Sequence, residues 1–82
     1  MDTPFVKRVY RTPRQHIAYL RFVLESYDGL AFIRTLDSRQ ALVEIAYPPS
    51  RRLDAEALLS ALAQELSLEE VDASVASDYP PL

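Results

Sequence analysis

The stretch Glu25-Ser26-Tyr27-Asp28-Gly29-Leu30-Ala31 contains the only glycine of the chain, at the point where a helical pattern of apolar residues gives way to a strand-like one. Glycine adopts the left-handed backbone region without the steric penalty of a Cβ atom, so it can end a helix and reverse the chain. The stretch therefore predicts a helix that closes at Gly29 and a strand that follows it. The rest of the element order is obtained by working outward from this junction.

Upstream of the junction, apolar residues recur at the three- and four-residue spacing of a helix face, namely Ile17, Leu20, Val23, Leu24 and Tyr27. Thr12 followed by Pro13 is typical of an N-cap with proline at the first helical position, so we expect the helix to begin there. The preceding residues 5–11 have the length and composition of a strand.

The inward face of this first strand is open from the sequence. Turning Val9 and Phe5 inward would also turn Lys7 toward the core, whereas turning Val6 and Tyr10 inward would do the same to Arg8. Either choice requires a long basic side chain to extend past the apolar layer to water.

Downstream of the junction, residues 30–36 and 41–47 are β-rich and are separated by only four residues, which predicts an antiparallel hairpin. The favoured register turns Arg34 and Glu44 outward as a cross-strand pair. The opposite parity would bury Phe32 together with Arg34. In the favoured register the core side chains are Ala31, Ile33, Thr35, Val43, Ile45 and Tyr47, and the outward apolar side chains are Phe32, Leu36, Leu42 and Ala46.

The second half repeats the order of helix and strand. Pro48-Pro49-Ser50 ends the hairpin, and Asp54 is positioned to cap a helix that runs through Leu66, with Leu53 and Leu58 at the spacing of a hydrophobic staple. Residues 68–75 predict a final strand, placed at an edge of the sheet because three of them are acidic. We expect one domain over residues 1–76 and a flexible tail over residues 77–82.

The order β-α-β-β-α-β predicts an α+β ferredoxin-like sandwich, in which a four-stranded antiparallel sheet carries both helices on one face. The first and third strands should be central. The other face would then expose an apolar surface unless something covers it, so we expect Phe32, Leu36, Leu42 and Ala46 to form an interface with a second copy or a larger protein partner.

The composition of the chain limits the classes of protein to which it can belong. Hydrophobic residues make up 49% and charged residues 26% of the chain, as in ordinary globular domains, and no apolar run approaches the length of a membrane span. There is no cysteine, and the N-terminus lacks a signal-peptide pattern, so we expect a cytoplasmic protein without membrane contact. The formal charge is -3, with the basic residues concentrated before residue 40 and the acidic ones after it.

Candidate catalytic and metal-binding residues are few. His16 is the only histidine and has no cysteine or second histidine to complete a zinc site, so we expect it on a solvent-facing helix position. Glu25, Asp28 and Asp37 could meet near one end of the hairpin and hold a hard cation, but all three are also ordinary helix-end and turn residues. No serine has an evident histidine partner. We therefore expect neither an enzyme nor a bound metal or cofactor.

The same topology occurs in RNA-recognition domains, which stack bases on aromatic side chains of the two central strands. Residues 41–47, the expected third strand, contain neither that aromatic motif nor a basic residue, and the chain is acidic overall. Arg8, Tyr10 and Arg11 are the residues in favour of RNA. We expect no nucleic-acid partner.

Several segments together resemble a family of short bacterial proteins known only as a domain of unknown function: Tyr10-Arg11, His16-Ile17-Ala18-Tyr19-Leu20-Arg21-Phe22, Glu25-Ser26-Tyr27-Asp28-Gly29-Leu30-Ala31 and Arg34-Thr35-Leu36-Asp37. The similarity covers residues 8–75 and implies no activity. More distantly, the topology is similar to that of ACT domains, which implies dimerisation through sheet edges or helices and effector binding near the turn between first strand and first helix. Here that turn is Arg11-Thr12-Pro13-Arg14 and lacks the glycine that such sites use.

Two functional hypotheses follow. The first is a noncatalytic association module that self-associates through its sheet. The second is an ACT-like sensor of a small anionic metabolite, for which Arg11, Arg14 and Arg34 would supply positive charge near the start of the first helix.

Overall fold

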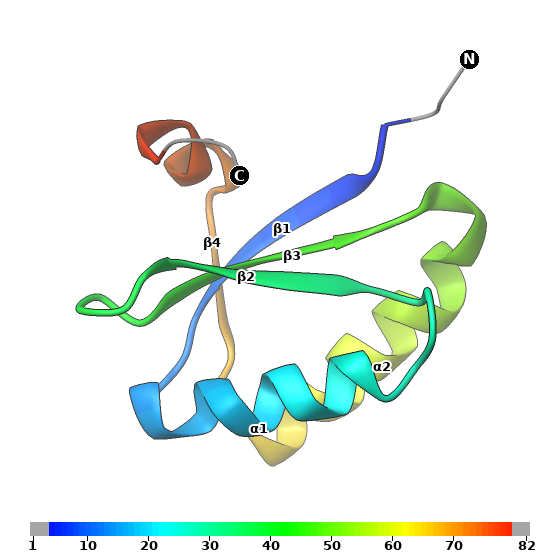
Figure 1. The fold of residues 1–82 in the computed structure, drawn as a ribbon, viewed down its shortest axis with the longest axis horizontal. Helices are drawn as coiled ribbons and strands as arrows, with labels where there is room; N and C mark the ends of the chain where they lie inside the picture. The colour runs from blue at the N-terminus through cyan, green and yellow to red at the C-terminus, as the bar shows by residue number, and fades with distance from the viewer. Residues whose placement is uncertain (1–3, 80–82) are drawn as a thin grey trace.

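The computed structural model describes residues 4–79 of the chain. Its elements are, in order, β1 (Val6–Arg11), α1 (Arg14–Glu25), β2 (Phe32–Asp37), β3 (Leu42–Tyr47), the 3-10 helix η1 (Pro49–Arg51), α2 (Arg52–Glu65), β4 (Glu69–Val71) and the 3-10 helix η2 (Ala73–Asp78). The strands form one antiparallel sheet in the order β2-β3-β1-β4. Figure 1 shows α1 and α2 on one face of this sheet and η2 on the other. The ferredoxin-like prediction, with β1 and β3 central, is confirmed.

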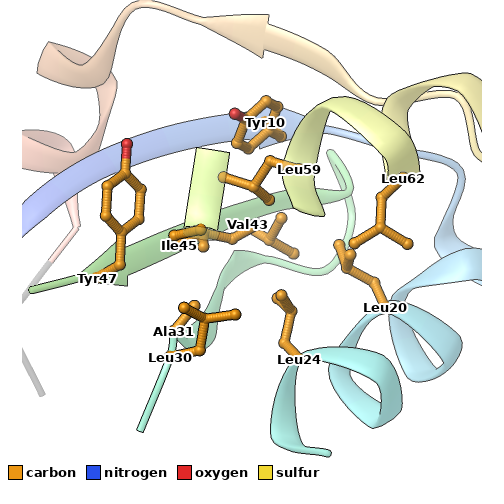
Figure 2. Close-up of a cluster of buried hydrophobic side chains, with 11 residues drawn as sticks. Tyr10, Leu20, Leu24, Leu30, Ala31, Val43, Ile45, Tyr47, Leu59 and Leu62 are labelled. Atoms are coloured by element: carbon orange, nitrogen blue, oxygen red, sulfur yellow. The ribbon is translucent and has the colours of Figure 1, made fainter. Parts of the chain in front are cut away.

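The main core lies between the sheet and the two helices. Leucines of α1 and α2 point toward the inward side chains of β3, and Figure 2 shows these side chains gathered in one cluster. The buried members are Tyr10, Leu20, Leu24, Leu30, Ala31, Val43, Ile45, Tyr47, Ala55, Leu59 and Leu62. The predicted inward side chains of β3 are all among them, because the hairpin has the predicted register.

That register pairs Ile33 with Ile45 and Arg34 with Glu44. Arg34 Nε donates to Glu44 Oε1 at 2.8 Å, so the charge pair that favoured this parity is formed. The hairpin turn contains two features that the sequence analysis did not predict, a register shift between Thr35 and Asp37 and a positive φ of 56° at Ala41.

The helix boundaries differ from the prediction at three ends. The N-cap of α1 is Pro13 rather than Thr12, and the cap residue makes no side-chain hydrogen bond. The α1 helix ends at Glu25, four residues before Gly29, so the glycine is not its immediate C-terminal cap. The α2 helix begins at Arg52, before the predicted cap Asp54, because the chain enters it through η1. Leu53 is 82% exposed and cannot act as the expected staple.

Gly29 instead lies in a turn that is closed by a hydrogen bond from the Leu30 N–H to the Tyr27 carbonyl oxygen at 3.1 Å. Its φ of 72° is in the left-handed region, as the sequence predicts. No heavy atom lies within 4 Å of the position that a Cβ would take, so a substitution meets backbone strain but no collision.

We expect Gly29→Val to lower the free energy of unfolding by about 1–2 kcal/mol, because a β-branched residue is strained in the left-handed region. Urea denaturation measures the effect. Gly29→Asn is the matched control and should cost less, because asparagine tolerates positive φ. Equal midpoints for Gly29→Val and the unmodified protein would contradict the backbone argument.

The sequence left open which face of β1 is turned inward, and the structure buries side chains on both faces. Tyr10 belongs to the main core, whereas Val9, on the opposite face, is fully buried outside that core. Contacts between η2 and β1 explain this second buried face. The outer face of the central strands is therefore partly covered by the chain's own C-terminal segment.

This covering segment replaces most of the predicted last strand. Only residues 69–71 pair with β1, and the chain then crosses the outer face as η2. Asp72 caps η2 by accepting from the Ser74 N–H at 2.9 Å, and the Tyr79 hydroxyl donates to Asp37 Oδ2 at 3.1 Å. Residues 77 and 78, assigned above to a tail, belong to this helix, whereas residues 80–82 lie outside the described residues. The flexibility of residues 77–82 stays a prediction.

Candidate functional site

With the C-terminal segment in place, some of the predicted interface residues are buried and others stay exposed. Leu42 is only 2% exposed, so its side chain is not available to a partner while η2 is in place. Leu36 and Ala46 are half-buried. Phe32 is 54% exposed and stacks on Phe5, with 5.8 Å between ring centroids. The apolar surface that remains on this face is thus smaller than predicted and lies beside β2.

The two edges of the sheet differ in how they are protected. The β4 edge is three residues long and carries Glu69 and Glu70, which pair with arginines of β1. The β2 edge is six residues long and contains no lysine or proline, and its Arg34 is bound to β3. Within residues 4–79, no strand pairs with the free edge of β2. Natural sheets usually shorten, charge or bulge such an edge, and β2 has Arg34, Asp37 and a register shift near its end. It is nevertheless the longer edge, and its first residues are the less protected part.

A groove of about 500 Å³ lies between α1 and β2, alongside this less protected edge. The ring of Phe22 is 72% exposed at the groove. Arg21 joins the two elements, because its Nη2 donates to Thr35 Oγ1 at 3.3 Å. The other lining residues are Arg14, Ile17, Ala18, Glu25 and Ser38. The sequence analysis assigned Arg21 and Phe22 no role, since both fall outside the predicted core stripe.

The three arginines proposed for anion binding do not meet in one site. Arg34 is paired with Glu44, and Arg11 Nη1 forms an ion pair with Glu69 Oε1 at 3.2 Å. Arg14 lies in the groove beside β2, whereas Arg11 lines a different pocket. Their spread over separate surfaces removes the basic cluster that the sequence suggested.

The pocket beside Arg11 lies at the turn from β1 to α1 and has a volume of about 490 Å³. Thr12 lines this pocket, and its hydroxyl oxygen is buried without a hydrogen-bond partner. A buried hydroxyl without a partner is unfavourable, and most such groups in native proteins are satisfied by protein, water or a ligand. The Thr12 backbone N–H is already bound, donating to the Ala41 carbonyl oxygen at 3.1 Å.

A polar network that the sequence analysis missed surrounds Arg8 on the helix side of the sheet. Its Nε donates to the Tyr47 hydroxyl at 2.8 Å, and its Nη1 and Nη2 donate to Glu70 and Glu56 at 2.9 and 3.0 Å. Tyr47 in turn donates to Glu56 Oε2 at 2.6 Å. The Tyr47 hydrogen bond raises the pKa of Arg8 and lowers the pKa of Glu56, while burial raises the pKa of Tyr47.

This network resolves the problem of an inward-facing Arg8 by pairing rather than by extension into water. Every polar atom in it has a partner, as buried networks require for stability. The signal that could have found it was the excess of acidic residues after residue 40, which supplies both glutamates. Because all three guanidinium nitrogens of Arg8 donate hydrogen bonds within the chain, we assign the network a structural role.

Metal and membrane sites can be addressed over the described part of the chain. Among residues 4–79, no three histidine or acidic side chains are grouped to hold a metal ion. Of the three acids considered for a cation, Asp37 binds the Arg39 and Gln40 backbone N–H groups, and the Gln40 bond contributes most to the lowering of its pKa. Over the same residues, neither helix is long and apolar enough to cross a bilayer. The expected cytoplasmic location stays a prediction.

Comparison with models of protein families gives a match. The family model described as "Domain of unknown function (DUF4911)" matches residues 10–66. No curated protein and no solved structure is significantly similar to the chain. The matched range contains α1, the β2–β3 hairpin and α2, and it ends before η2.

Proposed function

We infer the function from geometry, because the chain belongs to a family, Domain of unknown function (DUF4911), whose description names no activity. We propose that it is a noncatalytic association module that forms a homodimer by pairing the β2 edges of two copies. The observation that carries this proposal is the asymmetry between the short, acidic β4 edge and the longer, less protected β2 edge. A free strand edge presents unpaired N–H and carbonyl groups that another strand can bind.

Apolar side chains on both sides of the β2 edge favour the same surface. Phe32 extends from the outer face of the strand, and Phe22 extends from α1 on the inner side. A second copy that pairs with β2 would cover both rings, whereas the monomer leaves them in water. For a domain of 82 residues, with a core near the lower limit of sufficiency, this added burial is a gain in stability.

We expect Phe22→Glu/Phe32→Lys to be a folded monomer, because the two charges would have to be desolvated on pairing. Light scattering and analytical ultracentrifugation over micromolar concentrations measure the mass. Leu53→Glu is the matched control, since Leu53 is the most exposed large apolar residue and lies on α2. A monomeric unmodified protein at high micromolar concentration would overturn the proposal, as would a double variant that still dimerises.

A second candidate function is binding of a small carboxylate- or phosphate-bearing metabolite in the pocket at the β1–α1 turn. The buried Thr12 hydroxyl without a partner is the observation in its favour. An anion could accept a hydrogen bond from this hydroxyl and displace Glu69 from Arg11, and the N-terminal end of α1 adds a favourable dipole. Arg11 is the residue that would carry the charge, since Arg14 and Arg34 lie elsewhere.

Titration with a panel of anionic metabolites, followed by the backbone amide NMR shifts of residues 11–17, tests this second function. We expect saturable shifts that Arg11→Ala abolishes and Arg14→Ala leaves intact, because only Arg11 lines the pocket. No saturable response across the panel, or equal loss in the two variants, would reject the site.

A further inference from the structure

We propose that the partner of this surface is a second copy whose α1 lies antiparallel to the first, in the register that sets Phe22 against the partner's Ala18 and Arg14 against the partner's Glu25. This inference rests on the proposed β2 edge pairing and adds the helix contact beside it. It follows from the distribution of side chains along the groove between α1 and β2.

The groove side of α1 is self-complementary in size. Phe22 is a large and mostly exposed ring, and Ala18, one turn earlier, is a small exposed residue. In an antiparallel helix pair, residues whose numbers have a constant sum face each other across a two-fold axis. Setting Phe22 against Ala18 of a second copy places that axis close to Leu20 and repeats the same contact on the other side of it.

The charges of the same face are self-complementary in the same register. Arg14 begins α1 and Glu25 ends it, and both side chains line the groove. Glu25 Oε2 also lies 3.9 Å from Arg21 Nη1 of the same helix, an exposed contact that the partner's Arg14 would join. The midpoint between Arg14 and Glu25 also lies close to Leu20. An antiparallel pair would therefore bring each arginine to the partner's glutamate, whereas a parallel pair would bring like charges together. The residue numbers of Phe22 and Ala18 add up to 40 and those of Arg14 and Glu25 to 39, so the size and charge contacts agree to within one residue of register.

The strand contact requires the same axis, and the structure supplies the link. An antiparallel pair of β2 edges has its two-fold axis near the middle of the strand, where Thr35 would lie opposite Thr35 of the second copy, because residues opposite each other in a sheet point to the same face. The hydrogen bond from Arg21 to Thr35 holds this part of β2 against the middle of α1. One two-fold axis can therefore pass between both pairs of elements, which a closed dimer with isologous contacts requires.

Cysteine cross-linking tests the register directly, because the chain contains no cysteine. In Arg14→Cys/Glu25→Cys, the two introduced thiols of one helix are about 16 Å apart at the rise of an α-helix, so they cannot join within a chain. In the proposed register each lies opposite the other thiol of the partner, so a disulfide, which needs roughly 4–7 Å between Cα atoms, can form only between the two copies. Arg14→Cys alone is the matched control, since its two copies lie at opposite ends of the helix pair.

We expect air oxidation to convert most of the double variant, and little of the single variant, to a covalent dimer whose peptide map joins position 14 to position 25. We also expect Arg14→Glu to weaken dimerisation by about two- to fivefold, the range of an exposed ion pair, and added Glu25→Arg to restore it. A dimer by light scattering that gives no such disulfide overturns the helix register and leaves the edge pairing standing. A monomeric unmodified protein overturns both.

Discussion

Replacing Leu42 with lysine is expected to lower the stability of the fold strongly rather than to change its association. Leu42 lies on the outer face of β3, but its side chain is 2% exposed. An ammonium group there would be buried, and the Asp37 carboxylate opposite Leu42 already accepts three hydrogen bonds within the chain. The expected cost is several kcal/mol, about half or more of the stability of a small domain. Circular dichroism and thermal melting measure the loss.

Two control variants separate this burial effect from a general effect of surface charge. Leu53→Lys places the same charge on an exposed position of α2 and should keep the native melting temperature within a few degrees. Leu42→Ala should cost about 2–5 kcal/mol, the usual range for truncating a buried leucine. A folded Leu42→Lys variant with native stability would show that the C-terminal segment does not cover this residue in solution.

The sequence predicted the strands, helices and hairpin register because these elements carry strong periodic patterns. The Arg34 and Glu44 pair allowed only one parity without burying a lone charge, and the structure has that parity. Helix ends were less predictable, because Thr12 is a good N-cap residue in isolation, yet α1 begins at Arg14 with Pro13 in the cap position. Tertiary contacts that join distant residues override such local preferences.

The C-terminal cover was missed because residues 73–78 have neither the alternation of a strand nor the spacing of an amphipathic helix. The signal that could have found it was the ambiguous parity of β1. Both Val9 and Tyr10 are apolar neighbours that point to opposite faces, and a strand with apolar residues on both faces is typically buried on both. The apolar residues on both faces of β1 therefore indicated that the second face of the strand is covered as well.

The candidate site shows the same division between local pattern and tertiary arrangement. Phe32 was recognised as outward-facing from alternation alone, whereas the groove at Phe22 depends on how α1 lies beside β2. The spread of Arg11, Arg14 and Arg34 over separate surfaces could not be predicted either, because their distances depend on the turn geometry at Thr12 and Ala41. Edge protection, however, could be compared from the sequence once the strand order was assumed.

Removing Arg34 is the second substitution with a large expected effect. Arg34→Leu leaves Glu44, whose side chain is 8% exposed, without the cation that it binds at 2.8 Å. Breaking a buried pair by removing one partner costs about 3–5 kcal/mol, so the urea midpoint should fall strongly. Arg34→Leu/Glu44→Leu should recover most of the loss, because two apolar side chains facing each other leave no unpaired charge.

Arg51→Leu is the matched control, since its contact with Asp54 at 4.0 Å is exposed and should contribute less than about 1 kcal/mol. If Arg34→Leu and Arg51→Leu lower stability equally, the Arg34 and Glu44 pair behaves as a solvated surface pair, and the C-terminal segment cannot be excluding water from that part of the sheet.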